Sequence, residues 1–202
     1  MLLRNIILSV TLGFSLSQVF FAQNNEGVIS GNFSSTVQLY NEDTIINSAY
    51  PDHRLGANSF ANLNFNKGNF SAGVRLESYL NPLEGYPQGF NGSGLGYRYA
   101  NWNQDGLDIT IGNFYDQFGS GMILRIWESR DLGIDNAMDG LKVKYNPYKG
   151  VYVKGLIGKQ RHTFFDGLNN GNGIVRGFDG EININELFDS TLSDSKLQVT
   201  IG

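Results

Sequence analysis

Apolar and polar residues alternate with a period of two over most of the chain beyond residue 26. In residues 69–80, apolar Val74 and Leu76 fall on one face, and Arg75 and Glu77 fall on the other. This period is typical of β-strands with one apolar and one polar face. The same alternation predicts strands at residues 31–40, 58–66, 107–111, 141–145, 151–157, 181–185 and 196–201. We therefore expect an all-β chain of about nine strands, many of them longer than the usual five or six residues.

The connections between the expected strands alternate in length. Short turns that contain glycine or proline are expected at residues 67–69, 104–106 and 146–150. Long polar connections are expected at residues 41–56, 81–94, 117–140 and 162–172. Outer-membrane barrels place long loops on the outside and short turns in the periplasm. The alternation therefore favours an antiparallel up-and-down transmembrane β-barrel over a soluble sandwich.

The composition of the polar face points the same way. It consists mainly of Asn, Ser, Thr, Gly, Gln and Tyr, whereas a solvated exterior usually carries more Lys and Glu. We therefore expect the polar face to line a lumen and the apolar face to meet lipid. Bacterial barrels have an even number of strands, and the sequence stops within an expected strand. These features predict that residues 23–202 are the N-terminal part of a larger barrel.

The first residues of the chain have a separate character. Arg4 precedes a nearly continuous apolar run over residues 6–21, which ends at the small Ala22. This is the pattern of a secretory signal peptide, so residues 1–22 are expected to be cleaved after Ala22 and the mature chain to reach the outer membrane. An N-terminal membrane anchor is the alternative, although the run is barely long enough for one.

The overall composition excludes several classes of protein. Charged residues make up 17% of the chain and the net charge is −4, which argues against a nucleic-acid-binding protein. The absence of cysteine excludes a disulfide framework, a thiolate metal site and a cysteine nucleophile.

Motifs of enzymes are missing from the sequence. It contains no Gly-x-Ser-x-Gly elbow, no phosphate-binding loop and no His-Glu-x-x-His motif, so we expect neither an enzyme nor a cofactor. His53 and His162 are expected to be solvated loop residues. Residues 166–173 carry recurring oxygen-bearing side chains, but their spacing differs from that of a calcium-binding EF-hand loop, and we expect an ordinary loop.

Charged residues are densest at 125–131, within the longest expected loop. If this loop folds into the lumen, its charges would form a constriction that filters solutes. The alternative is an external loop whose charges pair with one another. The residues expected at the constriction are Arg125, Glu128, Arg130 and Asp131. Further lumen candidates on the strands are Arg75, Glu77, Arg98, Lys142 and Lys144, together with Asp108 and Lys154. Their mixed signs predict no preference for anions or cations.

Three segments, residues 111–125, 132–140 and 154–161, carry a resemblance to known proteins. They resemble a family of outer-membrane β-barrel proteins of unassigned function from Gram-negative bacteria of the Bacteroidota type. The resemblance implies a porin-sized barrel larger than this chain. It implies no substrate. From the barrel interpretation as a whole, we expect outer-membrane lipid and other envelope proteins as partners.

Two functions from different classes follow from these patterns. The first is an outer-membrane barrel that serves as a channel or as a structural or accessory component. The second is a secreted, β-rich carbohydrate-binding module that uses Trp102, Trp127 and loop tyrosines as stacking surfaces. A barrel-borne enzyme lacks a catalytic constellation in this sequence.

Overall fold

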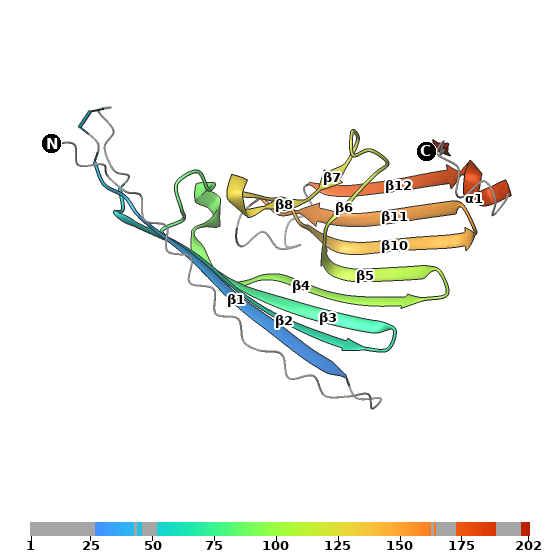
Figure 1. Cartoon of the computed structure of the whole chain (residues 1–202), viewed down its shortest axis with the longest axis horizontal. Coiled ribbons are helices and arrows are strands. Elements are labelled where there is room, and N and C mark those ends of the chain that lie inside the picture. The colour runs from blue at the N-terminus through green and yellow to red at the C-terminus, as the bar shows by residue number, and fades with distance from the viewer. Residues whose placement is uncertain (1–26, 43, 46–51, 163, 165–172, 189–198) are drawn as a thin grey trace.

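The structure is a computed structural model that describes residues 27–42, 44–45, 52–162, 164, 173–188 and 199–202. Most of these residues lie in one antiparallel sheet (Figure 1). Its nine strands, in sheet order, are β1 (Val28–Leu39), β2 (Leu55–Lys67), β3 (Phe70–Leu80), β4 (Gly92–Gln104), β5 (Leu107–Phe114), β10 (Met138–Tyr148), β11 (Val151–Gln160), β12 (Ile174–Asn183) and β13 (Thr200–Ile201). The all-β prediction is confirmed. The expected signal peptide and the loop at 166–173 lie outside the described residues, apart from residue 173.

Over the described residues the sheet is open. Strand β1 forms one edge and pairs with β2 alone. At the other edge, β13 pairs with β12 only at Ile182 and Asn183. The two edges do not pair with each other, so the described strands do not close into the expected barrel.

From β1 to β12, long connections and short turns lie at opposite ends of the strands (Figure 1). Short turns join β2 to β3, β4 to β5 and β10 to β11. In the turn between β4 and β5, Asp105 and Gly106 have φ angles of 49° and 78°. A tight two-residue hairpin needs two such left-handed residues, and Asp and Gly adopt this conformation readily. The predicted alternation of loop lengths is confirmed up to β12, whereas residues 184–199 make a long connection to β13 at the end of the short turns.

The two faces of the sheet differ from those of a soluble protein. On β3, Val74 and Leu76 are 40% and 55% exposed, whereas Arg75 and Glu77 are 5% and 2% exposed. Cross-strand partners share a face, so the register extends each surface over the sheet. The side carrying Val74 is called the apolar face, and its exposed members on other strands include Phe33, Leu63, Trp102, Ile111, Leu141 and Ile157. The side carrying Arg75 is called the polar face.

A long segment between β5 and β10 covers part of the polar face, and it is called the folded loop (residues 115–137). It contains two small hairpins, β6 (Asp116–Gln117) with β7 (Arg125–Ile126) and β8 (Glu128–Ser129) with β9 (Ile134–Asp135), and the 3-10 turn η2 (Arg130–Leu132). Ile126 packs with Phe114, Met138 and Leu156. A second buried cluster joins Phe60 and Tyr79 of the sheet to Phe90, at the end of the 3-10 turn η1 (Gln88–Phe90), and to Phe164.

Arg98, one of the lumen candidates, lies on the apolar face and not on the expected polar face. Strict alternation from Leu95 would place Arg98 on the polar face. The pairing of β3 with β4 shifts by one residue at Gly96, and one extra residue exchanges the faces of everything that follows. Arg98 therefore pairs with Val74 on the apolar face. The expectation that Arg98 shares the polar face with Arg75 is wrong.

The expected strand at residues 181–185 is wrong in its second half. Strand β12 ends at Asn183, and the short helix α1 (Ile184–Phe188) follows. The side chain of Asn183 accepts a hydrogen bond from the backbone N–H of Glu186 (3.2 Å) and donates one to its carboxylate (3.3 Å). This reciprocal cap stabilises the first turn of a helix. Of the strand expected at residues 196–201, the structure describes residues 199–202, with β13 at Thr200–Ile201.

Candidate functional site

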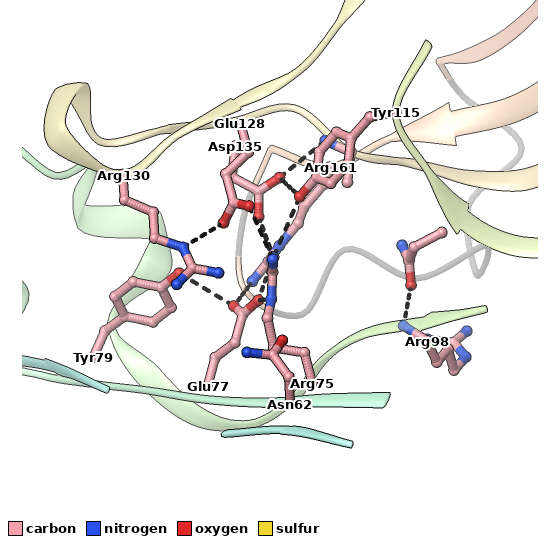
Figure 2. Close-up of polar contacts among 12 residues, drawn as sticks. Asn62, Arg75, Glu77, Tyr79, Arg98, Tyr115, Glu128, Arg130, Asp135 and Arg161 are labelled. Atoms are coloured by element: carbon pink, nitrogen blue, oxygen red, sulfur yellow. Dashed lines mark hydrogen bonds and ion pairs between the residues drawn. The ribbon is translucent and has the colours of Figure 1, made fainter. Parts of the chain in front are cut away.

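A buried charge network lies between the polar face and the folded loop, and Arg75 is at its centre (Figure 2). Arg75 Nε donates to Glu77 Oε1 at 2.5 Å, and the two residues share a face because they are two positions apart on β3. Arg75 Nη1 donates to Glu128 Oε2 and Nη2 to Asp135 Oδ2, both at 3.0 Å. Glu128 and Asp135 lie side by side because they are register partners in the β8–β9 hairpin.

A second guanidinium, that of Arg161, completes the pairing of these carboxylates. Arg161 directly follows β11 and donates from Nη2 to Glu77 Oε2 at 2.7 Å and from Nη1 to Asp135 Oδ2 at 2.8 Å. Arg130 Nε donates to Glu128 Oε1 at 3.1 Å. The network thus combines three arginines with three carboxylates, so its formal charge is balanced. Buried charges are tolerated when they are paired and hydrogen-bonded in this way.

Aromatic rings surround the network. The guanidinium of Arg75 lies 4.9 Å from the ring centre of Tyr97, and that of Arg130 lies 4.0 Å from the ring centre of Phe60. Such contacts stabilise a cation, and more so where water is excluded. The Tyr115 hydroxyl donates to Asp135 Oδ1 at 2.9 Å. Enclosure in a medium of low dielectric constant strengthens each ionic hydrogen bond and rigidifies the whole cluster.

Tyr115 and Arg161, which lie beyond the ends of β5 and β11, each keep one charge state at neutral pH. Burial raises the pKa of the Tyr115 hydroxyl, and the charge of Asp135 raises it further. Burial would lower the pKa of Arg161, but the hydrogen bond and charge of Glu77 outweigh it, and the net pKa is raised. Tyr115 therefore stays neutral and Arg161 stays charged. The arrangement is suited to clamping the loop to the sheet rather than to transferring protons.

A second charged cluster, called the lysine cluster (Asp116, Lys142, Lys144 and Lys154), fixes the start of the folded loop. Asp116 Oδ2 lies 2.7 Å from Lys144 Nζ and 3.2 Å from Lys142 Nζ, and its Oδ1 lies 2.9 Å from Lys154 Nζ. Lys154 Nζ also donates to the carbonyl of Gln117 at 2.6 Å. Burial alone would raise the pKa of Asp116, but hydrogen bonds from Lys144 and Lys154 and the charge of Lys142 lower it overall. Asp116 is therefore held firmly in its ionised form.

Comparison with known proteins assigns the chain to a family. Residues 3–202 match a family of unknown function, DUF6029. The chain belongs to the DUF6029 family. No curated protein and no solved structure matches it. The expected family of unassigned function is confirmed to that extent. All nine strands, the folded loop and both charged clusters of this DUF6029 chain lie within the matched residues.

The structure brings some of the expected constriction residues together and separates others. Arg75, Glu77, Glu128 and Arg130 belong to the charge network, and Lys142 and Lys144 belong to the lysine cluster. Arg125 is exposed and stacks on Trp127, with 4.7 Å from the guanidinium to the ring centre. Asp131 is exposed and forms no hydrogen bond or ion pair with another described residue. The folded loop therefore contributes Glu128 and Arg130 to the network, while Arg125 and Asp131 lie outside it.

Sequence reasoning missed Tyr115, Asp116, Asp135 and Arg161 as site residues. Asp116 and Arg161 lie just beyond the ends of β5 and β11, where alternation no longer assigns a face. The signal that could have identified Asp116 and Arg161 is the low frequency of charged residues in this chain. In a chain with 17% charged residues, an isolated charge beside the end of a strand has a high chance of pairing with charges on neighbouring strands.

The described part of this DUF6029 chain shows no arrangement typical of a metal site. Within it, no group of three or more His, Asp or Glu residues could hold a metal ion. The same residues contain no helix that is long and apolar enough to cross a membrane.

Proposed function

We propose that this DUF6029 chain forms part of the wall of a transmembrane β-barrel in the outer membrane, and that the folded loop narrows its polar lumen. One observation carries the proposal. The sheet exposes Val74 and Leu76 while it buries Arg75 and Glu77. Exposed apolar area costs about 25 cal/mol per Å² in water, and soluble monomers rarely expose large contiguous apolar patches. Lipid removes this cost.

The folded loop supports a restricted passage rather than a wide pore. It is tied to the polar face at two places, by the charge network around Arg75 and by the lysine cluster around Asp116. A loop held in this way lies in the path of solutes and places fixed charges beside them. The proposed role is that of a narrow or gated channel.

The open edges set a condition on this proposal. Unpaired backbone groups cost several kcal/mol each in hydrocarbon. The free edge of β1 and most of the outer edge of β12 must therefore be paired in the membrane, by further strands or by other copies of the chain.

The carbohydrate-binding alternative gains little support from the positions of the tryptophans. Trp102 lies on the apolar face, opposite Ile109, whereas Trp127 belongs to the folded loop, which covers the polar face. The two rings are on opposite sides of the sheet and do not form a shared stacking platform. The proposal therefore favours the membrane barrel.

Fractionation of the cell envelope tests the proposal. We expect the full-length protein in the outer membrane, where it should resist extraction by salt and urea and dissolve only in detergent. Recovery of folded protein from the soluble periplasm would contradict the proposal. Specific, saturable binding of such soluble protein to a glycan array would then support the carbohydrate-binding module.

A further inference from the structure

A row of polar side chains crosses the apolar face, and it is called the polar row (Arg98, Asn113, Asp139 and Lys159). The register pairs Asp139 with Asn113 on one side and with Lys159 on the other. The backbone N–H of Arg98 donates to the Asn113 side chain at 2.9 Å, and Arg98 Nη2 donates to Asp139 Oδ2 at 3.1 Å. The row contains two cations and one carboxylate, so its formal charge is positive.

The position of the polar row along the strands matters in a membrane. A cation that faces lipid costs about 2–4 kcal/mol at the midplane and much less near the interface. Asn113, Asp139 and Lys159 each lie one residue from the long-loop end of β5, β10 or β11. Arg98 lies in the middle of β4, and its hydrogen bonds with Asn113 and Asp139 place its guanidinium at their level. The polar row therefore fits the level of the lipid headgroups on the side of the long loops.

A hollow of about 460 Å³ opens on the apolar face beside Arg98. Most of the residues that line it are apolar, and the small side chains of Ala72 and Ala100, which face each other across β3 and β4, form its floor. Leu63, Phe65, Val74 and Ile111 contribute to its walls. Ala100 is two residues nearer to the short turn than Arg98. The hollow therefore extends from Arg98 towards the end of the sheet that carries the short turns.

We propose that the polar row and the hollow bind one lipid molecule with an anionic phosphate headgroup, with the phosphate at Arg98 and an acyl chain in the hollow. This inference rests on the proposed outer-membrane barrel. It goes further because it assigns a specific lipid site to the outside of the barrel.

Charge and direction both favour this ligand. The side chain of Arg98 is 52% exposed and has one ion pair, with Asp139, so donors of its guanidinium remain for a phosphate, which arginine binds well. In the proposed orientation the long loops face outwards. The lipid headgroup would then lie at the outer interface and its acyl chain would run towards the midplane, as the lipids of the outer leaflet do.

Native mass spectrometry of the full-length protein in a neutral detergent tests this site. Phosphatidylglycerol and phosphatidylcholine with identical acyl chains are added at matched concentrations. We expect the wild type to retain one phosphatidylglycerol per chain, with a preference over phosphatidylcholine of about tenfold, which corresponds to about 1.4 kcal/mol. Phosphatidylcholine carries the same phosphate, but its choline cation cancels the net negative charge that the positively charged polar row attracts.

Two pairs of variants separate the roles of charge and shape. Arg98→Gln should abolish the preference, whereas Arg176→Gln, an exposed arginine on the same face opposite Ile157, should leave it unchanged. Ala100→Leu fills the hollow and should weaken the binding of both lipids. Ala61→Leu, which lies on the same face outside the hollow, should not.

Several outcomes would overturn the inference. They are equal retention of the two lipids by the wild type, equal effects of Arg98→Gln and Arg176→Gln, and displacement of the lipid by glycerol phosphate alone. Dimers without bound lipid would instead assign the hollow to a second copy of the chain. If the protein fractionates to the outer membrane, any of these results refutes the lipid site but does not contradict the proposed barrel.

Discussion

Arg161 Nη2 lies 2.7 Å from Glu77 Oε2, although the residues are 84 positions apart in the sequence and their strands are not neighbours in the sheet. Glu77 is on β3 and Arg161 follows β11, four strands away. Four strand spacings correspond to about 19 Å along a flat sheet, which is too far for a direct contact between these side chains. The polar face must therefore be concave here, as the inner wall of a barrel is.

Glu77→Gln is expected to loosen the clamp on the folded loop. The change removes the charge of Glu77, the most deeply buried of the three carboxylates. It leaves Arg75 and Arg161 without full compensation, which typically costs about 3–5 kcal/mol. Asp131→Asn is the control, because Asp131 is exposed and surface changes stay within about 0.5 kcal/mol. Urea-induced unfolding in lipid vesicles, followed by tryptophan fluorescence, measures both. Equal stabilities of the two variants would contradict the clamp.

Gly96→Ala is expected to disturb the charge network by crowding the carboxylate of Glu77. A Cβ at Gly96 would overlap the Glu77 carboxylate, which cannot move away without breaking its bonds to Arg75 and Arg161. Overpacking of this kind costs about 1–3 kcal/mol. Gly155→Ala is the matched control, because a Cβ at Gly155 meets no atom within 4 Å. The same unfolding assay should show a lower stability for Gly96→Ala and an unchanged stability for Gly155→Ala. An unchanged stability of Gly96→Ala would show that Arg75 and Arg161 do not fix the position of Glu77.

The sequence predicts the strands well because alternation is a local signal. Residues 69–80 correspond to β3 (Phe70–Leu80), and the loop lengths sort as expected. The face of Arg98 was predicted wrongly because a single bulge at Gly96 depends on pairing with β3. The contacts of Arg161 were not predictable for another reason. They depend on the curvature of the sheet, which brings distant strands together and leaves no periodic trace in the sequence.

Asp116 should make stability depend on pH at the acidic end. Its pKa in the folded protein is lower than in the unfolded chain, where it is about 3.9, because the lysines outweigh the effect of burial. Its stabilising contribution is therefore complete above about pH 5 and is lost as the pH falls below the unfolded value. The stability gap between wild type and Asp116→Asn should narrow as the pH falls from about 6 to about 3, that is, from about two units above the unfolded pKa to about one unit below it.

The matched control for this pH series is Asp105→Asn. Asp105 lies in the exposed β4–β5 turn, and asparagine tolerates its left-handed conformation. This variant should follow the wild type at every pH. A gap between wild type and Asp116→Asn that is independent of pH would show that the lysines do not hold an ionised Asp116.

Release of the folded loop should widen the passage. Asp135→Ala removes the acceptor that Arg75, Arg161 and Tyr115 share, so the β8–β9 hairpin loses its attachment to the sheet. In planar lipid bilayers we expect a larger or more frequently open conductance for Asp135→Ala than for the wild type and for Asp131→Asn. Identical conductances for all three proteins would indicate that the loop does not restrict the lumen.

Labelling of two adjacent residues tests the orientation of the faces most directly. Phe33 is 51% exposed on the apolar face, and its neighbour Ser34 is exposed on the polar face. The natural chain has no cysteine, so Phe33→Cys and Ser34→Cys each introduce a single thiol. In intact outer membranes, a charged water-soluble thiol reagent should modify position 34 and reach position 33 only after unfolding. Comparable modification of both positions in the membrane, or faster modification of position 33, would contradict the assignment of the apolar face to lipid.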